Sequence, residues 1–210
     1  MSQKKESVSG KSLTILLPSG RLPGEVIRKV TGLKEHYRFD LYLSTAQNLR
    51  LYNLAEEDVE PIRQELSSLG VSFKGPGRFP LARVCIGSQG CNLGLCDTLA
   101  FSDAVAERFG SRSGVKPKFK IAVSGCPAAC SGPLLTDIGI VATRQGFDVF
   151  VGGKGGARPA VGRRIVRQAN VERVLEIIGL IADFHAAKTP TKQRMSKLLD
   201  EPGFPFPEEV

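Results

Sequence analysis

The sequence contains no tryptophan and only three tyrosines among its 210 residues. Proteins that bind single-stranded nucleic acid stack the bases on aromatic side chains set among basic ones. The formal net charge of +8 favours an anionic partner, but no aromatic-rich basic segment accompanies it. The charge therefore does not indicate nucleic acid, and a small anionic substrate or an anionic cofactor explains it equally well.

Long apolar runs are also scarce. No stretch approaches the roughly 20 apolar residues that a membrane-spanning helix needs. Residues 1–12 are polar and lysine-bearing and lack the apolar segment of a secretory signal, so we interpret them as a disordered tail. We expect a cytoplasmic protein without a membrane partner. In a reducing compartment, its five cysteines are more typical of metal binding than of disulfides.

Four of the cysteines form two pairs. Cys85 and Cys91 enclose five residues, two of them glycines that allow a tight loop. Cys126 and Cys130 enclose three residues, and a helix opened by Pro127 would place both sulfurs on one face. A [4Fe–4S] cluster takes four thiolates, whereas structural zinc pairs usually enclose two to four residues. The spacing favours the cluster, with zinc and ordinary buried cysteines as alternatives.

The fifth cysteine and both histidines receive structural interpretations. Apolar spacing predicts a helix that follows Cys91 and runs to about Phe109, with Cys96 as one of its core residues. The amides at the start of this helix would point toward the negatively charged cluster. His36 and His185 lie far from the cysteines in the sequence, so we do not interpret them as ligands.

Residues 13–73 predict the order β-α-β-β-α-β. Apolar runs indicate strands at 13–17 and 39–43, the latter continuing by alternation to 51, and helical spacing follows at 24–35 and 59–69. This order is typical of a ferredoxin-like α+β unit, and the turn-rich residues 74–80 mark a boundary. We expect a ferredoxin-like half-domain over 13–75, a second α+β domain over 80–190 and a proline-rich C-terminal tail over 191–210.

These motifs resemble those of the sirohaem-dependent sulfite and nitrite reductases over about residues 13–185. Cys-x5-Cys followed by Gly-Cys-Pro-x-x-Cys is similar to the cluster signature of that family. The resemblance implies a ferredoxin-like unit followed by an α+β domain that binds sirohaem and a [4Fe–4S] cluster. It also implies that the cluster ligands are Cys85, Cys91, Cys126 and Cys130, and that Cys130 bridges the cluster to the sirohaem iron.

The resemblance further implies cationic side chains around a substrate anion. Arg-Leu-Pro-Gly at 21–24 and Lys-Phe-Lys at 118–120 match family motifs, and an arginine near the first cluster loop matches less closely. The candidate catalytic residues are Arg21, Arg83, Lys118 and Lys120. On an extended chain the two lysines would lie side by side, which is costly unless an anion separates them. A solvent-exposed, charged strand start is the alternative.

This sequence departs from one motif of the family. The family has a strand reading Thr-x-Arg-Gln, whose arginine faces the sirohaem, and Ala46 stands at that position here. Strand alternation would place Ser44, Asn48 and Arg50 on the same face, so that Arg50 supplies the missing charge. A solvated strand arginine is the alternative interpretation of Arg50.

A glycine-rich segment begins at residue 152 and continues with basic residues and no acid up to 167. It lacks the Gly-Lys-Ser/Thr ending of a P-loop. It resembles the family loop that lies over the sirohaem edge, where arginine pairs well with carboxylates. The candidates for this role are Arg158 and either Arg163 or Arg164.

The implied activity is six-electron reduction of sulfite to sulfide, with nitrite reduction to ammonia as the alternative. No flavin or nicotinamide fingerprint occurs, so we expect electrons from a separate donor protein. Larger family members contain two such halves and this chain contains one. We therefore expect a homodimer in which the cationic residues of one subunit face the sirohaem of the other. A non-catalytic electron carrier and an accessory subunit are the remaining alternatives.

Overall fold

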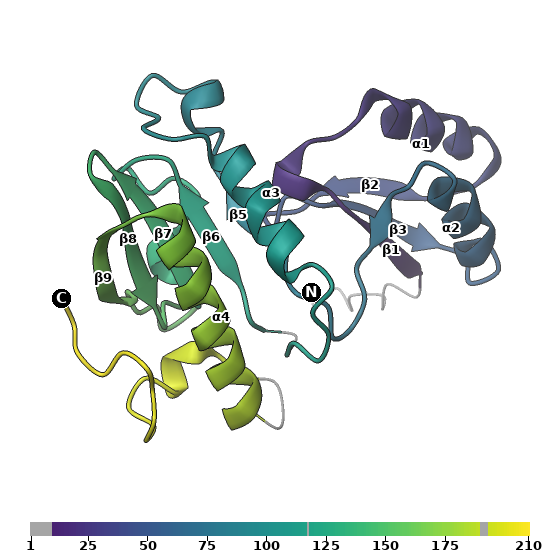
Figure 1. The fold of residues 1–210 in the computed structure, drawn as a ribbon. Coiled ribbons are helices and arrows are strands. Elements are labelled where there is room, and N and C mark those ends of the chain that lie inside the picture. Colours follow the sequence, from purple (N-terminus) through teal and green to yellow (C-terminus); the bar gives the residue numbers. More distant parts are fainter. Residues whose placement is uncertain (1–9, 117, 190–192) are drawn as a thin grey trace, which may run out of the picture. The chain divides into compact units, whose positions relative to one another are not determined.

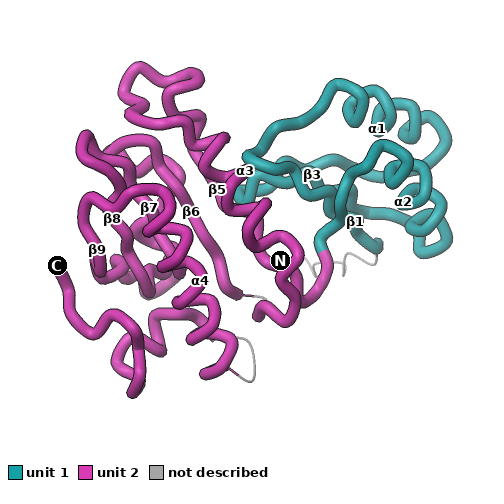
Figure 2. The backbone as a smooth tube through the Cα atoms, in the orientation of Figure 1, with its two compact units in different colours: residues 1–74 teal, residues 75–210 magenta. Residues whose placement is uncertain are grey.

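The structure is a computed structural model that describes residues 10–116, 118–189 and 193–210 (Figure 1). Most of the segment interpreted as an N-terminal tail, residues 1–9, lies outside the described residues. The chain divides into two compact units, Met1–Lys74 and Gly75–Val210 (Figure 2). Each unit has its own sheet and its own apolar core, so each is described by itself.

The first unit has the predicted β-α-β-β-α-β order. Its elements are β1 (Lys11–Leu16), the 3-10 turn η1 (Pro18–Gly20), α1 (Gly24–His36), β2 (Asp40–Leu43), β3 (Leu49–Leu54), α2 (Val59–Ser67) and β4 (Ser72–Phe73). The strands are antiparallel in the order β2-β3-β1-β4. Apolar stripes on both helices, including Val30 and Ile62, share one buried cluster with Ile15 and Leu51 of the sheet. This is a ferredoxin-like arrangement.

The link between β2 and β3 differs from the prediction. Residues 44–48 form a hairpin turn, in which the Ser44 amide donates to the Asn48 carbonyl and the Gln47 amide donates to the Ser44 carbonyl. Gln47 has a φ of 59°, which a continuing strand does not allow. Alternation therefore stops at residue 43, and the prediction that Ser44, Asn48 and Arg50 share one strand face is wrong.

The second unit is built on a five-stranded mixed sheet. The strands β5 (Arg83–Val84), β6 (Ile121–Ser124), β7 (Ile138–Thr143), β8 (Gly146–Val151) and β9 (Arg163–Ala169) lie in chain order across it. The first three are parallel and the last three antiparallel. All four residues of β6 are buried, as expected for a central strand covered on both faces.

In the described part of this unit, two helices and three short 3-10 turns accompany the sheet. The helix α3 (Thr98–Phe109) packs on β5 and β6, and α4 (Val171–Lys188) packs on β8 (Figure 1). The turns are η2 (Gly87–Gln89), η3 (Pro133–Leu135) and η4 (Met195–Lys197). None of the helices in the described ranges is long and apolar enough to cross a membrane.

The C-terminal residues do not form a separate tail. Met195, Leu198 and Phe204 are buried in the core of the second unit, and the ring of Phe204 packs edge-on against that of Phe184. Proline excludes regular structure from residues 203–207 but does not prevent packing. Residues 193–210 therefore belong to the second unit.

Candidate iron–sulfur and anion-binding site

The sheet of the second unit brings the two cysteine loops together. The parallel strands β5 and β6 pair Arg83 with Ala122 and Val84 with Val123. Cys85 follows β5 directly, and Cys126 follows β6 after one glycine. Because the carboxyl ends of parallel strands lie at the same edge of a sheet, both loops start side by side.

Contacts between the two loops are close. The Gly125 amide donates to the Cys85 sulfur at 3.1 Å, and the Leu95 amide donates to the Gly125 carbonyl at 2.7 Å. A Cβ atom on Gly125 would lie 2.9 Å from the Cα atom of Gly87. A side chain at residue 125 would therefore push the loops apart.

The second cysteine pair lies in a turn rather than a helix. The Ala129 amide donates to the Cys126 carbonyl at 3.2 Å, and Ala129 has a φ of 56°. The prediction that Pro127 opens a helix carrying both thiols is therefore wrong. The loop is closed by a buried pair of hydroxyls, Ser124 and Ser131, whose oxygens lie 2.7 Å apart. The Ser131 hydroxyl also donates to the Val123 carbonyl at 2.7 Å.

The donor set fits a [4Fe–4S] cluster. Cys126 is buried and Cys85 half-buried, whereas Cys91 and Cys130 are exposed on the same two loops. All five cysteines are free thiols, and an amide donor on a sulfur is one of the contacts that tune such clusters. Within the described ranges, no three His, Cys, Asp or Glu side chains converge as they would around a single metal ion.

Cys96 precedes α3 and does not lie within it. It is half-buried against the core of the second unit, and burial raises the pKa of its thiol to about 11, with added effects from Cys85, Asp97 and Cys126. A neutral core thiol is the interpretation that this environment favours. The amides of Leu99 and Ala100 at the start of α3 donate to the Asp97 side chain, and the orientation of the start of this helix toward the cluster stays a prediction.

Arg83 connects β5 to the turn that follows the second cysteine pair. Its terminal nitrogen donates to the Gly132 carbonyl at 3.4 Å and to the Thr136 hydroxyl at 3.3 Å. Burial lowers the pKa of the guanidinium. Its Nε is buried without a hydrogen-bond partner in the described part of the chain. The guanidinium of this candidate therefore lies against the loop that carries Cys130.

In the first unit, Gly20, which precedes Arg21, lies beside the hairpin turn that contains Ala46, since a Cβ atom on Gly20 would lie 3.2 Å from the Gln47 Cβ. The Leu17 amide donates to the Asn48 side chain at 3.1 Å, and the Asn48 amide donates to the Ser44 hydroxyl at 3.1 Å. Arg21 is exposed, and its Nε donates to the Pro18 carbonyl at 3.4 Å. Ser44 and Asn48 thus hold the turn and the end of β1 together, a few residues before Arg21 in the chain.

Arg50 is an exposed residue of β3. Its guanidinium donates to the Ser12 hydroxyl on β1 at 2.9 Å. That contact fits the alternative of a solvated strand arginine, while a role at the cofactor remains a prediction.

Lys118 and Lys120 are both exposed, and Phe119 between them is only 2% exposed. The Phe119 ring packs against His185, with 4.8 Å between ring centroids, and against Phe79 at 6.3 Å. The buried ring fixes the segment, so the lysines on either side of it project outward. Residue 117, which precedes them, lies outside the described residues.

The glycine-rich loop between β8 and β9 carries one exposed arginine. Arg158 lies beyond the paired backbone of Lys154 and Ala160, whose amides donate to each other's carbonyls at 2.9 Å. Arg163 instead donates to the Leu199 carbonyl at 2.8 Å, and Arg164 donates to the main-chain oxygen of Val210 at 2.7 Å. Arg158 is therefore the candidate whose position best suits a carboxylate from outside the chain.

The sequence did not reveal Asp137 and Arg194, two residues that hold the start of the glycine-rich loop. Asp137 is completely buried and accepts a hydrogen bond from Arg194 at 2.8 Å. They lie 57 positions apart, and neither belongs to a recognisable motif. Nothing in the sequence pattern pairs them.

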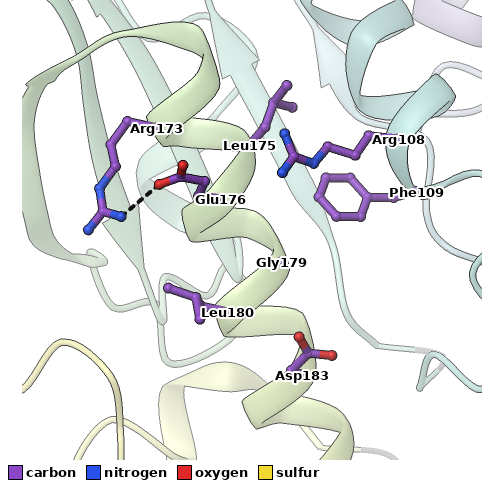
Figure 3. A pocket seen from close by; sticks show the side chains of 8 residues that line it. All are labelled: Arg108, Phe109, Arg173, Leu175, Glu176, Gly179, Leu180 and Asp183. Carbon is purple, nitrogen blue, oxygen red and sulfur yellow. Dashed lines mark hydrogen bonds and ion pairs between the residues drawn. The ribbon is translucent and has the colours of Figure 1, made fainter.

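A hollow of about 390 Å³ lies elsewhere, between α3 and α4 (Figure 3). Its lining includes Phe109, Leu180 and the ion pair of Arg173 with Glu176 at 2.8 Å. None of the candidate catalytic, cofactor-binding or cluster-binding residues lines it.

A ferredoxin-like unit joined to a sheet that presents two cysteine loops defines an iron–sulfur oxidoreductase. Sequence models of two protein domains match the chain. The ferredoxin-like half domain of nitrite/sulfite reductases matches residues 3–69, and the nitrite and sulphite reductase 4Fe-4S domain matches residues 82–206. The chain therefore belongs to the nitrite and sulphite reductase family, whose cofactors are the [4Fe–4S] cluster and sirohaem.

Relatives include both kinds of reductase. The assimilatory-type sulfite reductase of Nitratidesulfovibrio vulgaris is 27% identical over 187 residues, which cover 89% of this chain and 85% of that protein. The coenzyme F420-dependent sulfite reductase of Methanocaldococcus jannaschii is 32% identical over 130 residues, which cover 60% of this chain and 20% of that protein. A nitrite reductase [NAD(P)H] of Bacillus subtilis is 25% identical over 185 residues, which cover 88% of this chain and 23% of that protein. The chain thus spans most of the first relative but less than a quarter of the other two.

Two solved structures share the fold. Dissimilatory sulfite reductase I superposes with a TM-score of 0.78 at 12% identity, covering 93% of this chain and 67% of that one. The NirA protein of Mycobacterium tuberculosis superposes with a TM-score of 0.70 at 16% identity, and the match covers 94% of this chain and 40% of that one. These likenesses confirm the predicted α+β fold class.

Proposed function

We propose that this chain is a sirohaem- and [4Fe–4S]-dependent enzyme that reduces sulfite to sulfide with six electrons. The supporting observation is the meeting of the two cysteine loops, where the Gly125 amide donates to the Cys85 sulfur. Sulfite is the preferred substrate because the relative matched over most of its length is a sulfite reductase. Nitrite reduction to ammonia is the second candidate, since nitrite reductases are also among the relatives.

Four thiolates would hold the cluster: Cys85, Cys91, Cys126 and Cys130, with Cys130 also reaching the sirohaem iron. When bound, the two cofactors would supply the electrons and an iron that binds the anion. Basic side chains surround the anion. Arg21, Arg83, Lys118 and Lys120 balance its negative charge and polarise its oxygens as these leave as water. The lysine ammonium groups also carry protons that the departing oxygens need.

A homodimer completes the proposed site. The two-half members of the family place the cysteines on one half and most anion-binding residues on the other, whereas this chain carries both sets in one copy. We propose that Arg21, Lys118 and Lys120 of one subunit face the sirohaem held by the other, across a two-fold interface. Sedimentation of the holoprotein at assay concentration tests this arrangement, and a fully active monomer would exclude it.

Purification without oxygen, followed by an absorption spectrum and assays of both anions with a reduced viologen dye, tests the proposed function. We expect cluster and sirohaem bands, and sulfide as the product from sulfite. Cluster bands without sirohaem would indicate an electron carrier, and bound sirohaem without turnover would indicate an accessory subunit. The natural electrons would come from a separate donor protein. A Cys130→Ser variant that keeps sirohaem bands and activity would remove the bridging role.

A further inference from the structure

The C-terminal segment, residues 193–210, is fastened to the core through a buried carboxylate. Asp137, directly before β7, is 0% exposed, and its Oδ1 accepts hydrogen bonds from Arg194 Nε and from the Met195 amide, both at 2.8 Å. Burial raises the pKa of Asp137, and the contacts with Met195 and Arg194 act in the opposite direction. A buried charge is tolerated only with such partners, so this contact fixes where the segment begins.

The same two residues hold the start of the glycine-rich loop, residues 152–162. Arg194 donates a second hydrogen bond to the Gly153 carbonyl at 2.9 Å, and the Gly152 amide donates to the Asp137 carbonyl at 2.9 Å. A Cβ atom on Gly152 would lie 2.6 Å from the Leu199 side chain. Gly152 has a φ of 81°, which favours glycine where the loop backbone passes the C-terminal segment.

The end of the loop is held by the same segment. Arg163, the first residue of β9, donates to the Leu199 carbonyl at 2.8 Å and to the Pro207 carbonyl at 3.3 Å. Its guanidinium also lies 5.5 Å from the centre of the Phe204 ring. Both ends of the loop therefore contact residues 193–210, although α4 separates the loop from that segment in the sequence.

The tip of the loop is open, in contrast to its base. A Cβ atom on Gly155 or Gly156 would meet nothing within 4 Å. Arg158 is exposed, and Lys154 is held by its backbone pairing with Ala160. A fixed base with an exposed basic tip is suited to an anionic ligand, because pre-organised side chains lose little freedom on binding.

We propose that residues 193–210 act as a strap that fixes the base of the 152–162 loop and so positions Lys154 and Arg158 for the carboxylates of the cofactor. Asp137 and Arg194 are the positioning residues of this strap, and neither is required to touch the cofactor. This inference rests on the proposed function, in which the carboxylate-bearing ligand is sirohaem.

An Arg194→Gln variant tests the strap through two readouts that do not require turnover. In the cofactor-free protein, the amides of Lys154 and Ala160 should exchange with deuterium about tenfold faster or more, because charge-assisted hydrogen bonds at the loop base are lost. In the reconstituted protein, sirohaem should bind about tenfold more weakly, as is typical when a supporting residue is removed, while cluster absorption stays at the wild-type level. Arg173→Gln, which removes an exposed ion pair on α4, is the matched control and should change neither quantity.

The double variant Asp137→Asn, Arg194→Gln removes the buried carboxylate together with its partly buried partner and serves if the single variant does not fold. Unchanged exchange at Lys154 and Ala160 in a folded variant would overturn the strap. Faster exchange with unchanged sirohaem affinity would overturn its positioning role. If the wild-type protein binds no sirohaem, the proposed function fails, whereas the exchange experiment still decides whether the strap fixes the loop.

Discussion

The backbone amide of Gly125 donates a hydrogen bond to the sulfur of Cys85 over 3.1 Å, although the two residues lie 40 positions apart. The parallel pairing of β5 with β6 brings them together, because it starts both cysteine loops at one edge of the sheet. The loops are thus positioned by the protein fold, and the cluster has only to join thiols that already lie on adjacent loops.

A Gly125→Ala variant should therefore lose cluster loading. The added Cβ would lie 2.9 Å from Gly87 Cα and 3.2 Å from the Thr98 side chain, so the loops would separate. We expect a lower cluster absorption per chain and a loss of about 1–3 kcal/mol in the free energy of unfolding, as is usual for overpacking. Gly32→Ala in α1, where a Cβ meets nothing within 4 Å, is the control and should leave cluster loading unchanged. Wild-type loading and stability in Gly125→Ala would refute this account.

The buried hydroxyl pair predicts a second effect. In a Ser131→Ala variant, the Ser124 hydroxyl would lose its side-chain partner 2.7 Å away. The Val123 carbonyl would lose one donor at 2.7 Å and keep the Cys85 amide at 3.3 Å. Because unsatisfied buried polar groups are costly, we expect about 1–3 kcal/mol less stability in urea denaturation. Ser111→Ala, at an exposed position of the same unit, should change stability by less than about 0.5 kcal/mol. Equal stabilities of the two variants would show that the hydroxyl pair does not hold the loop.

Much of the fold followed from the sequence, because local periodicity carries it. The β-α-β-β-α-β order was visible since each helix of the first unit has a buried stripe at helical spacing, such as Val26 and Val30. The two cysteine loops were visible since thiol spacing is a local pattern. The turn at 44–48 was not predicted, because the strand-like alternation of side chains continues through these residues. The positive φ is adopted by Gln47, and no glycine marks the turn.

Long-range contacts explain the remaining errors. The Asp137–Arg194 ion pair joins residues that only the folded chain brings together, so no local sequence pattern predicts it. The proline-rich C-terminal residues lack regular structure, yet Phe204 is buried by packing that periodicity does not describe. The turn at Ala129 was read as a helix because a proline after Cys126 suits a helix start equally well.

His185 predicts a pH dependence of stability. Burial lowers the pKa of its imidazole below 6.5, reinforced by Lys116 and opposed by Gln193 and Asp137. Between the lowered pKa and 6.5 the unfolded chain binds more protons, so stability rises with pH in that window and is lost as pH falls through it. A His185→Gln variant, which keeps a donor for the Gln193 carbonyl, should lose less stability than the wild type when the pH is lowered from about 8 to about 5.5.

The comparison with the wild type concerns two coupled groups, His185 and Asp137. Asp137 contributes with the opposite sign, because its raised pKa makes the folded chain bind more protons than the unfolded chain above pH 3.8. Both proteins contain Asp137, but the charge of His185 lowers the pKa of that carboxyl, so the difference between their denaturation curves reports the titration of His185 together with its effect on Asp137. Parallel pH dependences of the two proteins would show that His185 does not titrate as its burial predicts.

The exposed lysines on either side of Phe119 give the last prediction. Lys118→Ala should lower kcat for sulfite by about 10²–10³, the range found when one group that stabilises developing charge is removed. Its folding stability should stay close to that of the wild type, because the side chain is exposed while the buried Phe119 ring holds the segment. Lys188→Ala, an exposed lysine beside Phe184 on α4, controls for the loss of one positive charge from the chain and should retain wild-type kcat. A Lys118→Ala enzyme with unchanged turnover would reduce Lys118 to a surface charge and leave Arg21, Arg83 and Lys120 as the remaining candidates for binding the anion.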